Sequence, residues 1–204
     1  MSPFALDIAR TTGEHVVIVL IAVVVAIIIG VPLGIACTRR RRLGKVLLRT
    51  VDVIQTIPSL ALFGLLIPVP FIGGIGPRTA IVALILYSLL PIVRNTFTGI
   101  RGVDPTVRDA GTALGLTPRQ LLTQVELPLA MPTIVAGIRV ATVLAIGVAT
   151  IAAEIGGGGL GTFIFRGVAM VDTRLILAGA IPAACLAIVA DLVLTIVERM
   201  LVRE

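Results

Sequence analysis

The sequence predicts an all-α, polytopic membrane protein that crosses the bilayer about five times within a single domain, residues 1–204. Hydrophobic residues make up 57% of the 204 positions and charged residues only 14%, whereas soluble globular chains carry about 25% charged residues. The apolar residues gather in runs of about 20, the length that a helix needs to cross the hydrocarbon core. Polar residues lie mainly between those runs.

Five apolar runs give the expected transmembrane helices. They cover residues 16–37, 46–69, 79–98, 130–153 and 174–197. The first has no charged residue and would extend about 33 Å at about 1.5 Å per residue, enough to span the core. Asp7, Arg10 and Glu14 precede it and Arg39 to Arg42 follow it, whereas a signal peptide carries its positive residues before the apolar stretch. We therefore expect an anchor with its N-terminus outside.

The distribution of basic residues supports this orientation. Twelve of the 17 Lys and Arg residues lie in predicted cytoplasmic segments and four in predicted outer segments, with Arg139 inside the fourth crossing. Cytoplasmic loops of membrane proteins carry such an excess of positive charge. Five crossings and this bias place the C-terminus inside. They also make the net charge of +6 a signal of topology rather than of nucleic-acid binding.

Prolines are expected to break the second and third crossings, at Ile57-Pro58-Ser59 and at Leu90-Pro91. Freed backbone polar groups cannot face lipid, so broken helices often line a path or cavity. The polar residues near these breaks are candidates for a translocation path: Ser59, Tyr87, Asn95 and Thr96. Packing or hydrogen bonding between helices accounts for the same residues equally well.

Arg139 lies about nine residues into the fourth crossing, where an unpaired arginine costs on the order of 2.5 to 3.5 kcal/mol. Asp191 and Asp52 lie at comparable depths in the fifth and second crossings. We therefore predict a buried ion pair between Arg139 and one of these aspartates, with a structural role. Snorkelling of the guanidinium to the headgroups is the alternative.

The segment 100–128, between the third and fourth crossings, is the one substantial polar segment of the chain. Asp104 followed by Pro105 marks the start of a short helix, because Asp is a good N-cap and proline is tolerated in the first turn. Gly115 is suited to end that helix in a left-handed conformation. The segment should therefore begin with one short, well delimited helix on the cytoplasmic side.

A second short helix is expected to follow. Thr117 and Gln120 can form a capping box at its start, and Pro128 is expected to stop it. A DNA-reading helix-turn-helix needs a basic second helix, but Arg119 is the only cation here and Glu126 opposes it. Two interpretations are left: a connector between two crossings, and a docking element for a cytoplasmic partner.

Seven residues of the polar segment form a spaced pattern: Asp109, Ala110, Gly111, Gly115, Val125, Leu127 and Pro128. The pattern resembles the EAA loop of binding-protein-dependent ABC importer permeases, which reads Glu-Ala-Ala, three residues, Gly, nine residues, Ile, any residue, Leu-Pro. Asp109 and Val125 replace the Glu and Ile conservatively, and Gly111 in place of the second Ala should loosen the helix by about 0.5 to 1 kcal/mol. The resemblance implies a coupling helix that sits in a groove of a separate ATP-binding subunit.

Three further stretches, residues 53–62, 89–96 and 155–161, look like the osmoprotectant branch of these permeases, which moves glycine betaine, carnitine, choline or proline. The likeness covers nearly the whole chain. It implies an inner-membrane translocation subunit without catalytic residues or a cofactor of its own, with ATP and magnesium on the partner ATPase. It also implies a second permease copy or paralogue and an external substrate-binding protein. Uptake of amino acids such as methionine is the alternative within the same architecture.

Other classes of function find little support in the sequence. No Gly-x-x-x-x-Gly-Lys-Ser/Thr phosphate loop occurs, so ATP hydrolysis must belong to another polypeptide. Cys37, Cys185 and His15 lack metal-ligand spacing, and no catalytic constellation is visible. An ion-coupled secondary transporter is the rival from another class, but no internal repeat supports it. The glycines of 156–161 follow an apolar run and predict a tight turn or an unwound helix end on the outer side, not a nucleotide site.

Overall fold

The computed structural model describes residues 3–202, and every regular element in that range is helical. Within this range, four helices are long and apolar enough to cross a membrane: α1 (Pro3–Arg39), α4 (Pro77–Arg101), α7 (Leu127–Ile151, with helical turns on both sides) and α9 (Thr173–Val202). α4 packs between α1 and α7, and α9 packs against α7. The predicted all-α membrane fold is confirmed.

α2 (Arg41–Thr56) and α3 (Ser59–Leu66) form a bent pair, and the axes of Gly44–Thr56 and Ser59–Leu66 differ by 102°. Ile57 adopts an extended conformation with ψ 124°, because the residue before a proline is pushed out of the helical region. Pro58 has no N–H to continue the helix. The break expected in the second crossing, 46–69, at Ile57-Pro58-Ser59 is therefore confirmed.

The expected break at Leu90-Pro91 is wrong, because α4 is continuous from Pro77 to Arg101. Pro91 has no N–H, so the carbonyl of Tyr87, one turn earlier, loses its helical donor. The side-chain amide of Gln55 in α2 donates to that carbonyl at 3.0 Å. A neighbouring helix thereby satisfies the acceptor, as membrane helices require when a proline lies inside them.

α5 (Pro105–Ala113) and α6 (Pro118–Leu121) form the polar segment, and a π-helical turn, η1 (Leu122–Glu126), joins α6 to α7. The prediction that Pro128 stops the second short helix is wrong, since the backbone stays helical through η1 into α7. The N–H of Leu127 bonds to the carbonyl of Leu122, five residues earlier. This wider turn lets the helix continue past a residue that has no N–H to donate.

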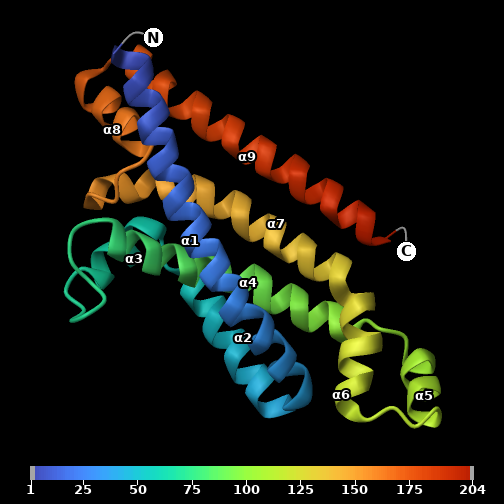
Figure 1. Cartoon of the computed structure of the whole chain (residues 1–204). Coiled ribbons are helices and arrows are strands. Elements are labelled where there is room, and N and C mark those ends of the chain that lie inside the picture. The colour runs from blue at the N-terminus through green and yellow to red at the C-terminus, as the bar shows by residue number, and fades with distance from the viewer. Residues whose placement is uncertain (1–2, 203–204) are drawn as a thin grey trace.

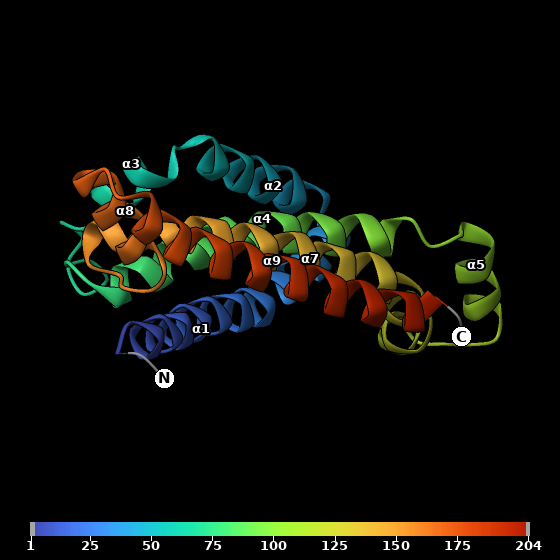
Figure 2. The same cartoon turned by 90° about the horizontal axis from the view of Figure 1, so that it is seen from above.

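At the opposite end of α7, a 3₁₀ turn, η2 (Ala152–Ile155), and α8 (Gly161–Met170) lead to α9. Figures 1 and 2 both place α3, α8 and the start of α1 at one end of the bundle, and α5 and α6 at the other. The molecule therefore has two distinct ends joined by the long helices.

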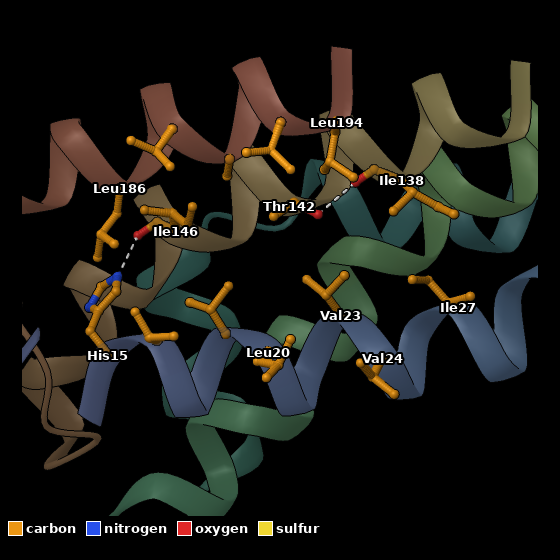
Figure 3. A pocket seen from close by; sticks show the side chains of 15 residues that line it. His15, Leu20, Val23, Val24, Ile27, Ile138, Thr142, Ile146, Leu186 and Leu194 are labelled. Carbon is orange, nitrogen blue, oxygen red and sulfur yellow. Dashed lines mark hydrogen bonds between the residues drawn. The ribbon is translucent and has the colours of Figure 1, made fainter. Parts of the chain in front are cut away.

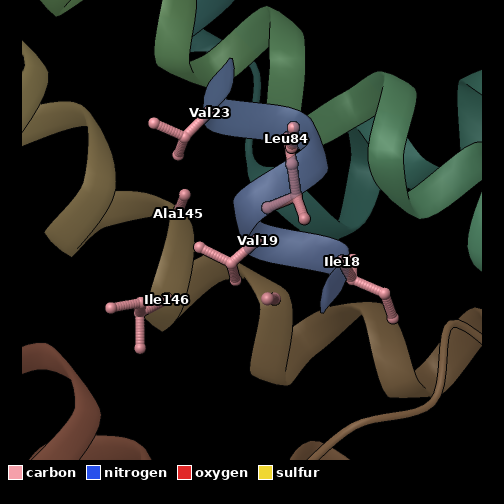
Figure 4. Close-up of a cluster of buried hydrophobic side chains, with 8 residues drawn as sticks. Ile18, Val19, Val23, Leu84, Ala145 and Ile146 are labelled. Atoms are coloured by element: carbon pink, nitrogen blue, oxygen red, sulfur yellow. The ribbon is translucent and has the colours of Figure 1, made fainter. Parts of the chain in front are cut away.

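Small and branched apolar residues fill the contacts among α1, α4 and α7. Figure 4 shows members of one buried cluster: Val19, Val23, Leu84 and Ala145. Glycines bring the backbones closer still, because a Cβ added at Gly34 would lie 2.5 Å from Cβ of Thr96, and one at Gly137 would lie 2.5 Å from Cβ of Asn95. Such small residues allow the close packing by which helices associate in lipid.

Candidate functional site

The start of α5 has the cap that the sequence predicts. Oδ1 of Asp104 accepts a hydrogen bond of 2.8 Å from the N–H of Thr106. This bond favours the ionised carboxylate and so lowers the pKa of Asp104 below its ordinary value. Pro105 occupies the first turn, where its missing N–H costs nothing.

The end of α5 is a Schellman motif built on Gly115. Gly115 has a φ of +83°, its N–H bonds to the carbonyl of Thr112 at 3.0 Å, and the N–H of Leu116 bonds to the carbonyl of Gly111 at 3.1 Å. No atom lies within 4 Å of a Cβ built at Gly115. A side chain at this position would therefore be disfavoured by the left-handed backbone conformation and not by steric crowding.

The capping box predicted at the start of α6 is present. The N–H of Thr117 donates to Oε1 of Gln120 at 2.9 Å, and the N–H of Gln120 donates to Oγ1 of Thr117 at 3.4 Å. Hydrogen-bonded caps therefore fix both sides of the turn between α5 and α6. Figure 1 shows this pair of helices at the far end of the bundle, beyond the long helices.

The seven pattern residues of the loop divide into exposed and packed positions. Asp109, Ala110, Gly115 and Pro128 are exposed, Val125 and Leu127 are half-buried, and Gly111 is buried. A Cβ at Gly111 would lie 2.8 Å from Cδ1 of Leu121, so the glycine lets α5 lie close to α6. The exposed members form the surface that a partner could reach.

Leu114 completes this surface, although the sequence pattern does not include it. The residue is 83% exposed and adjoins Gly115 at the tip of the loop. An apolar side chain projecting from a polar loop is suited to burial against another protein. The sequence signal that could have indicated it is its place directly before the left-handed glycine.

Glu126, at the end of η1, is a second residue that the spacing pattern does not indicate. Its side chain is only 4% exposed. Arg39, the last residue of α1, hydrogen-bonds to Oε2, and Nε of Arg108 in α5 lies 3.0 Å from Oε1. Glu126 thus pairs with these two arginines rather than simply opposing Arg119.

The structure separates the four candidate path residues into two groups. The hydroxyl of Tyr87 donates to the carbonyl of Ile57 at the α2–α3 bend, and Ser59 begins α3 just beyond that bend. Asn95 and Thr96 instead lie at the close helix contacts made by glycines of α7 and α1. The first pair belongs to a helix break, and the second pair belongs to helix packing.

The structure brings Arg139 to Asp191 but not to Asp52. Nε of Arg139 lies 3.9 Å from Oδ1 of Asp191 and 3.5 Å from Oε2 of Glu198. The Arg139, Asp191 and Glu198 side chains are 29%, 50% and 27% exposed, so the cluster lies on the flank of α7 and α9 and is not fully buried. Asp52 pairs instead with Arg94 of α4, at 3.0 Å.

The glycine-rich segment forms tight turns at the end that carries α8. Its left-handed residues are Gly156, Gly158 and Gly159. His15 of α1 packs against this segment, since its Nδ1 accepts a 3.4 Å hydrogen bond from the N–H of Leu160 and its Nε2 faces the carbonyl of Ile146 at 3.2 Å. A carbonyl can only accept, so Nε2 carries the ring proton in this arrangement.

His15 also lies at one end of an open apolar groove of about 410 Å³ between α1, α7 and α9. Figure 3 shows Leu20 and Val24 of α1 on one side of it and Leu194 of α9 on the other. The hydroxyl of Thr142 is engaged with the carbonyl of Ile138 in its own helix. The groove therefore offers little to hold a polar solute.

Comparison with known proteins agrees with this geometry. The chain matches the family model described as "Binding-protein-dependent transport system inner membrane component" over residues 30–204. The choline transport system permease protein OpuBB of Bacillus subtilis is 48% identical over 195 residues, 96% of this chain and 88% of that protein. The osmoprotectant import permease protein OsmW of Salmonella typhimurium is 48% identical over 186 residues, 90% of this chain and 86% of that protein.

A solved inward-facing structure of the MetNI methionine ABC transporter has the same fold, with a TM-score of 0.90 over 98% of this chain and 99% of that chain. Its sequence is 20% identical, so this likeness concerns the fold alone. The loop pattern, the helical bundle and the family match point the same way. The chain belongs to the binding-protein-dependent transport system inner membrane component family, the multi-pass permease subunits of ABC importers.

Proposed function

We propose that this chain is the translocation subunit of an ABC importer for osmoprotectants such as glycine betaine, carnitine, choline or proline. The observation that carries the proposal is the loop at one end of the bundle. Hydrogen-bonded caps fix its two helices, and Asp109, Leu114 and Gly115 are exposed on it. A surface fixed in this way suits a groove on a separate ATP-binding subunit, which would hold ATP and magnesium.

The substrate class draws support from the relatives described above, which are named for choline and osmoprotectant transport. Amino-acid uptake has less support, because the methionine transporter resembles this chain in fold but is only 20% identical in sequence. Both solute classes would use the same architecture. Sequence similarity of the permease therefore favours osmoprotectants.

Selection of a quaternary ammonium solute should reside mainly outside this chain. Such cations are usually held over aromatic faces, and the chain has no Trp, one Tyr and six Phe. The hydroxyl of Tyr87 is engaged at the α2–α3 bend, and Phe4 and Phe163 contact each other edge to face at 6.0 Å. We therefore assign selection to an external binding protein and the passage to this chain with a second permease subunit.

The proposed orientation puts α5 and α6 in the cytoplasm and the glycine-rich turns outside. Arg39, Arg101 and Arg199 lie in the last turns of α1, α4 and α9. Basic residues at these positions complement the helix dipole and match the excess of positive charge at cytoplasmic ends. The external binding protein would then meet the end formed by α3, α8 and the glycine-rich turns.

The proposal is tested by uptake into proteoliposomes that contain the permease, its ATP-binding subunit and its binding protein. With the proton gradient dissipated, ATP on the cytoplasmic face should drive accumulation of radiolabelled glycine betaine, carnitine, choline or proline. Radiolabelled methionine is the comparison solute. Accumulation of methionine alone would contradict the osmoprotectant assignment, and uptake that requires a proton gradient but no ATP would contradict the ABC mechanism.

A further inference from the structure

Arg39, Arg108 and Glu126 form a charge triad at the end of the bundle that carries the loop. The buried carboxylate of Glu126 receives a separate arginine at each oxygen, Arg39 at Oε2 and Arg108 at Oε1. Removing Glu126 would leave both arginines without their shared counter-charge. The positions of the two arginine side chains therefore depend on Glu126.

The charge triad joins elements that are far apart in the sequence. Arg39 ends α1, Arg108 lies on α5, and Glu126 ends the π turn that leads into α7. Nη2 of Arg108 also donates to the carbonyl of Ile100, in the last turn of α4. A single cluster thus connects α5 to the ends of three long helices.

The two contacts of Glu126, one with Arg39 and one with Arg108, differ in kind. Arg39 is hydrogen-bonded to Glu126. Nε of Arg108 is buried and makes no hydrogen bond within residues 3–202, so its contact with Oε1 at 3.0 Å is electrostatic. A hydrogen bond weakens steeply with misalignment, whereas Coulomb attraction falls gradually with distance. Arg108 can therefore turn relative to Glu126 and still attract its carboxylate, while Arg39 stays hydrogen-bonded to the same carboxylate.

Glu126 also occupies an unusual backbone position. It closes the π turn η1, and single π turns within helices are rare and frequently lie at functional sites. The turn sits directly between the capped helix α6 and the long helix α7. A displacement that runs along the backbone from α6 into α7 therefore passes through the residue that holds both arginines.

We propose that the charge triad transmits movement of the loop to α1, with Glu126 as the positioning residue between Arg108 and Arg39. The inference rests on the proposed docking of the loop to an ATP-binding subunit. A displacement of α5 carries Arg108, and Glu126 passes it to Arg39 and to the start of α7. A triad that only stabilised the fold would alter unfolding without altering how much solute is moved for each ATP hydrolysed.

The test uses the full complex of permease, ATP-binding subunit and binding protein in proteoliposomes. It measures radiolabelled glycine betaine transported per ATP hydrolysed, beside co-purification of the ATP-binding subunit. In Glu126→Gln and Arg108→Gln the ratio should fall about tenfold, a usual size for coupling between two sites, while co-purification is retained. Arg40→Gln is the matched control, because it removes an exposed charge next to Arg39 and leaves the triad intact; its ratio should equal that of the parent.

An unchanged ratio in Glu126→Gln and Arg108→Gln would overturn the inference, and so would an equal loss in Arg40→Gln. If Glu126→Gln does not accumulate in the membrane, the transport ratio of Arg108→Gln alone tests the inference, since this variant leaves Glu126 paired with Arg39. Gly115→Val in the same assay separates the two proposals. If it impairs docking and transport while the triad variants remain coupled, only the triad inference fails; if it leaves both intact, the docking proposal fails.

Discussion

The side-chain amide of Gln55 donates a 3.0 Å hydrogen bond to the backbone carbonyl of Tyr87. That carbonyl is the acceptor that Pro91 leaves without a helical donor. In the opposite direction, the hydroxyl of Tyr87 donates to the carbonyl of Ile57 at the α2–α3 bend. The helix α4, which contains Pro91, thus receives a donor from α2, and the bend at Pro58 receives a donor from α4. The two hydrogen bonds hold the bend against α4.

Gln55→Ala should lower the free energy of unfolding by about 2 kcal/mol, because it leaves the carbonyl of Tyr87 without a donor. The measurement is unfolding of the purified permease in mixed micelles. Thr56→Val is the control, since the exposed Thr56 hydroxyl bonds to the carbonyl of Val53 in its own helix. Its effect should stay within about 0.5 kcal/mol.

A double-mutant cycle with Pro91→Ala makes this assignment specific. Alanine at position 91 returns an N–H to α4, and that N–H can bond to the carbonyl of Tyr87. Gln55→Ala should then cost much less in the Pro91→Ala background than in the parent. Equal costs in both backgrounds would show that Gln55 does not replace the missing helical donor.

Gly111→Ala should be neutral or should stabilise the protein by up to about 1 kcal/mol, because alanine favours the helix. Its Cβ would lie 2.8 Å from Cδ1 of Leu121 and 3.3 Å from Cδ1 of Leu116, both ends of side chains that can turn aside. Gly137→Ala is the contrasting variant, since its Cβ would lie 2.7 Å from the backbone carbonyl of Pro91. It should cost about 1 to 3 kcal/mol. Unfolding measurements that reverse this order would contradict the packing described for the two glycines.

The Arg139 cluster predicts unequal roles for its two acids. Glu198→Gln should destabilise more than Asp191→Asn, because Glu198 lies closer to Arg139 and is less exposed. In a double-mutant cycle, Arg139→Gln and Glu198→Gln should show a coupling of about 1 kcal/mol. Asp52→Asn should show none with Arg139→Gln, since Asp52 pairs with Arg94. Coupling to Asp52 in place of Glu198 would contradict the observed arrangement.

These residues also explain how much the sequence could predict. The caps of α5 and α6 depend on partners within about one helical turn, so the spacing of Asp104, Gly115, Thr117 and Gln120 predicted them. Pro58 did break its helix, but two other proline signals were misleading, because a donor from another helix satisfies the carbonyl that Pro91 leaves free and a π turn carries the helix past Pro128. Gln55 and Tyr87 are 32 residues apart, and no local pattern shows that they meet.

The sequence could not predict the charge triad for the same reason. Arg39 and Glu126 are 87 residues apart, and the helices bring them together only after folding. Asp191 could be named in advance as a partner of Arg139, because depth in the membrane narrows the choice of partners. Depth alone could not exclude Asp52, since it does not say which faces of the helices meet.

The claim that the loop carries force between an ATP-binding subunit and the permease is tested most directly by Gly115→Val. Transport and co-purification of the ATP-binding subunit are measured in the same membranes, with the permease shown to be present at its normal level. Uptake should be lost and co-purification weakened, because valine strains the left-handed turn that orients the exposed tip. Gly115→Asn, which tolerates that backbone, should retain more of both, and Asp109→Lys should lose less than Gly115→Val. Full co-purification with full transport in Gly115→Val would contradict the account and leave the loop as a connector.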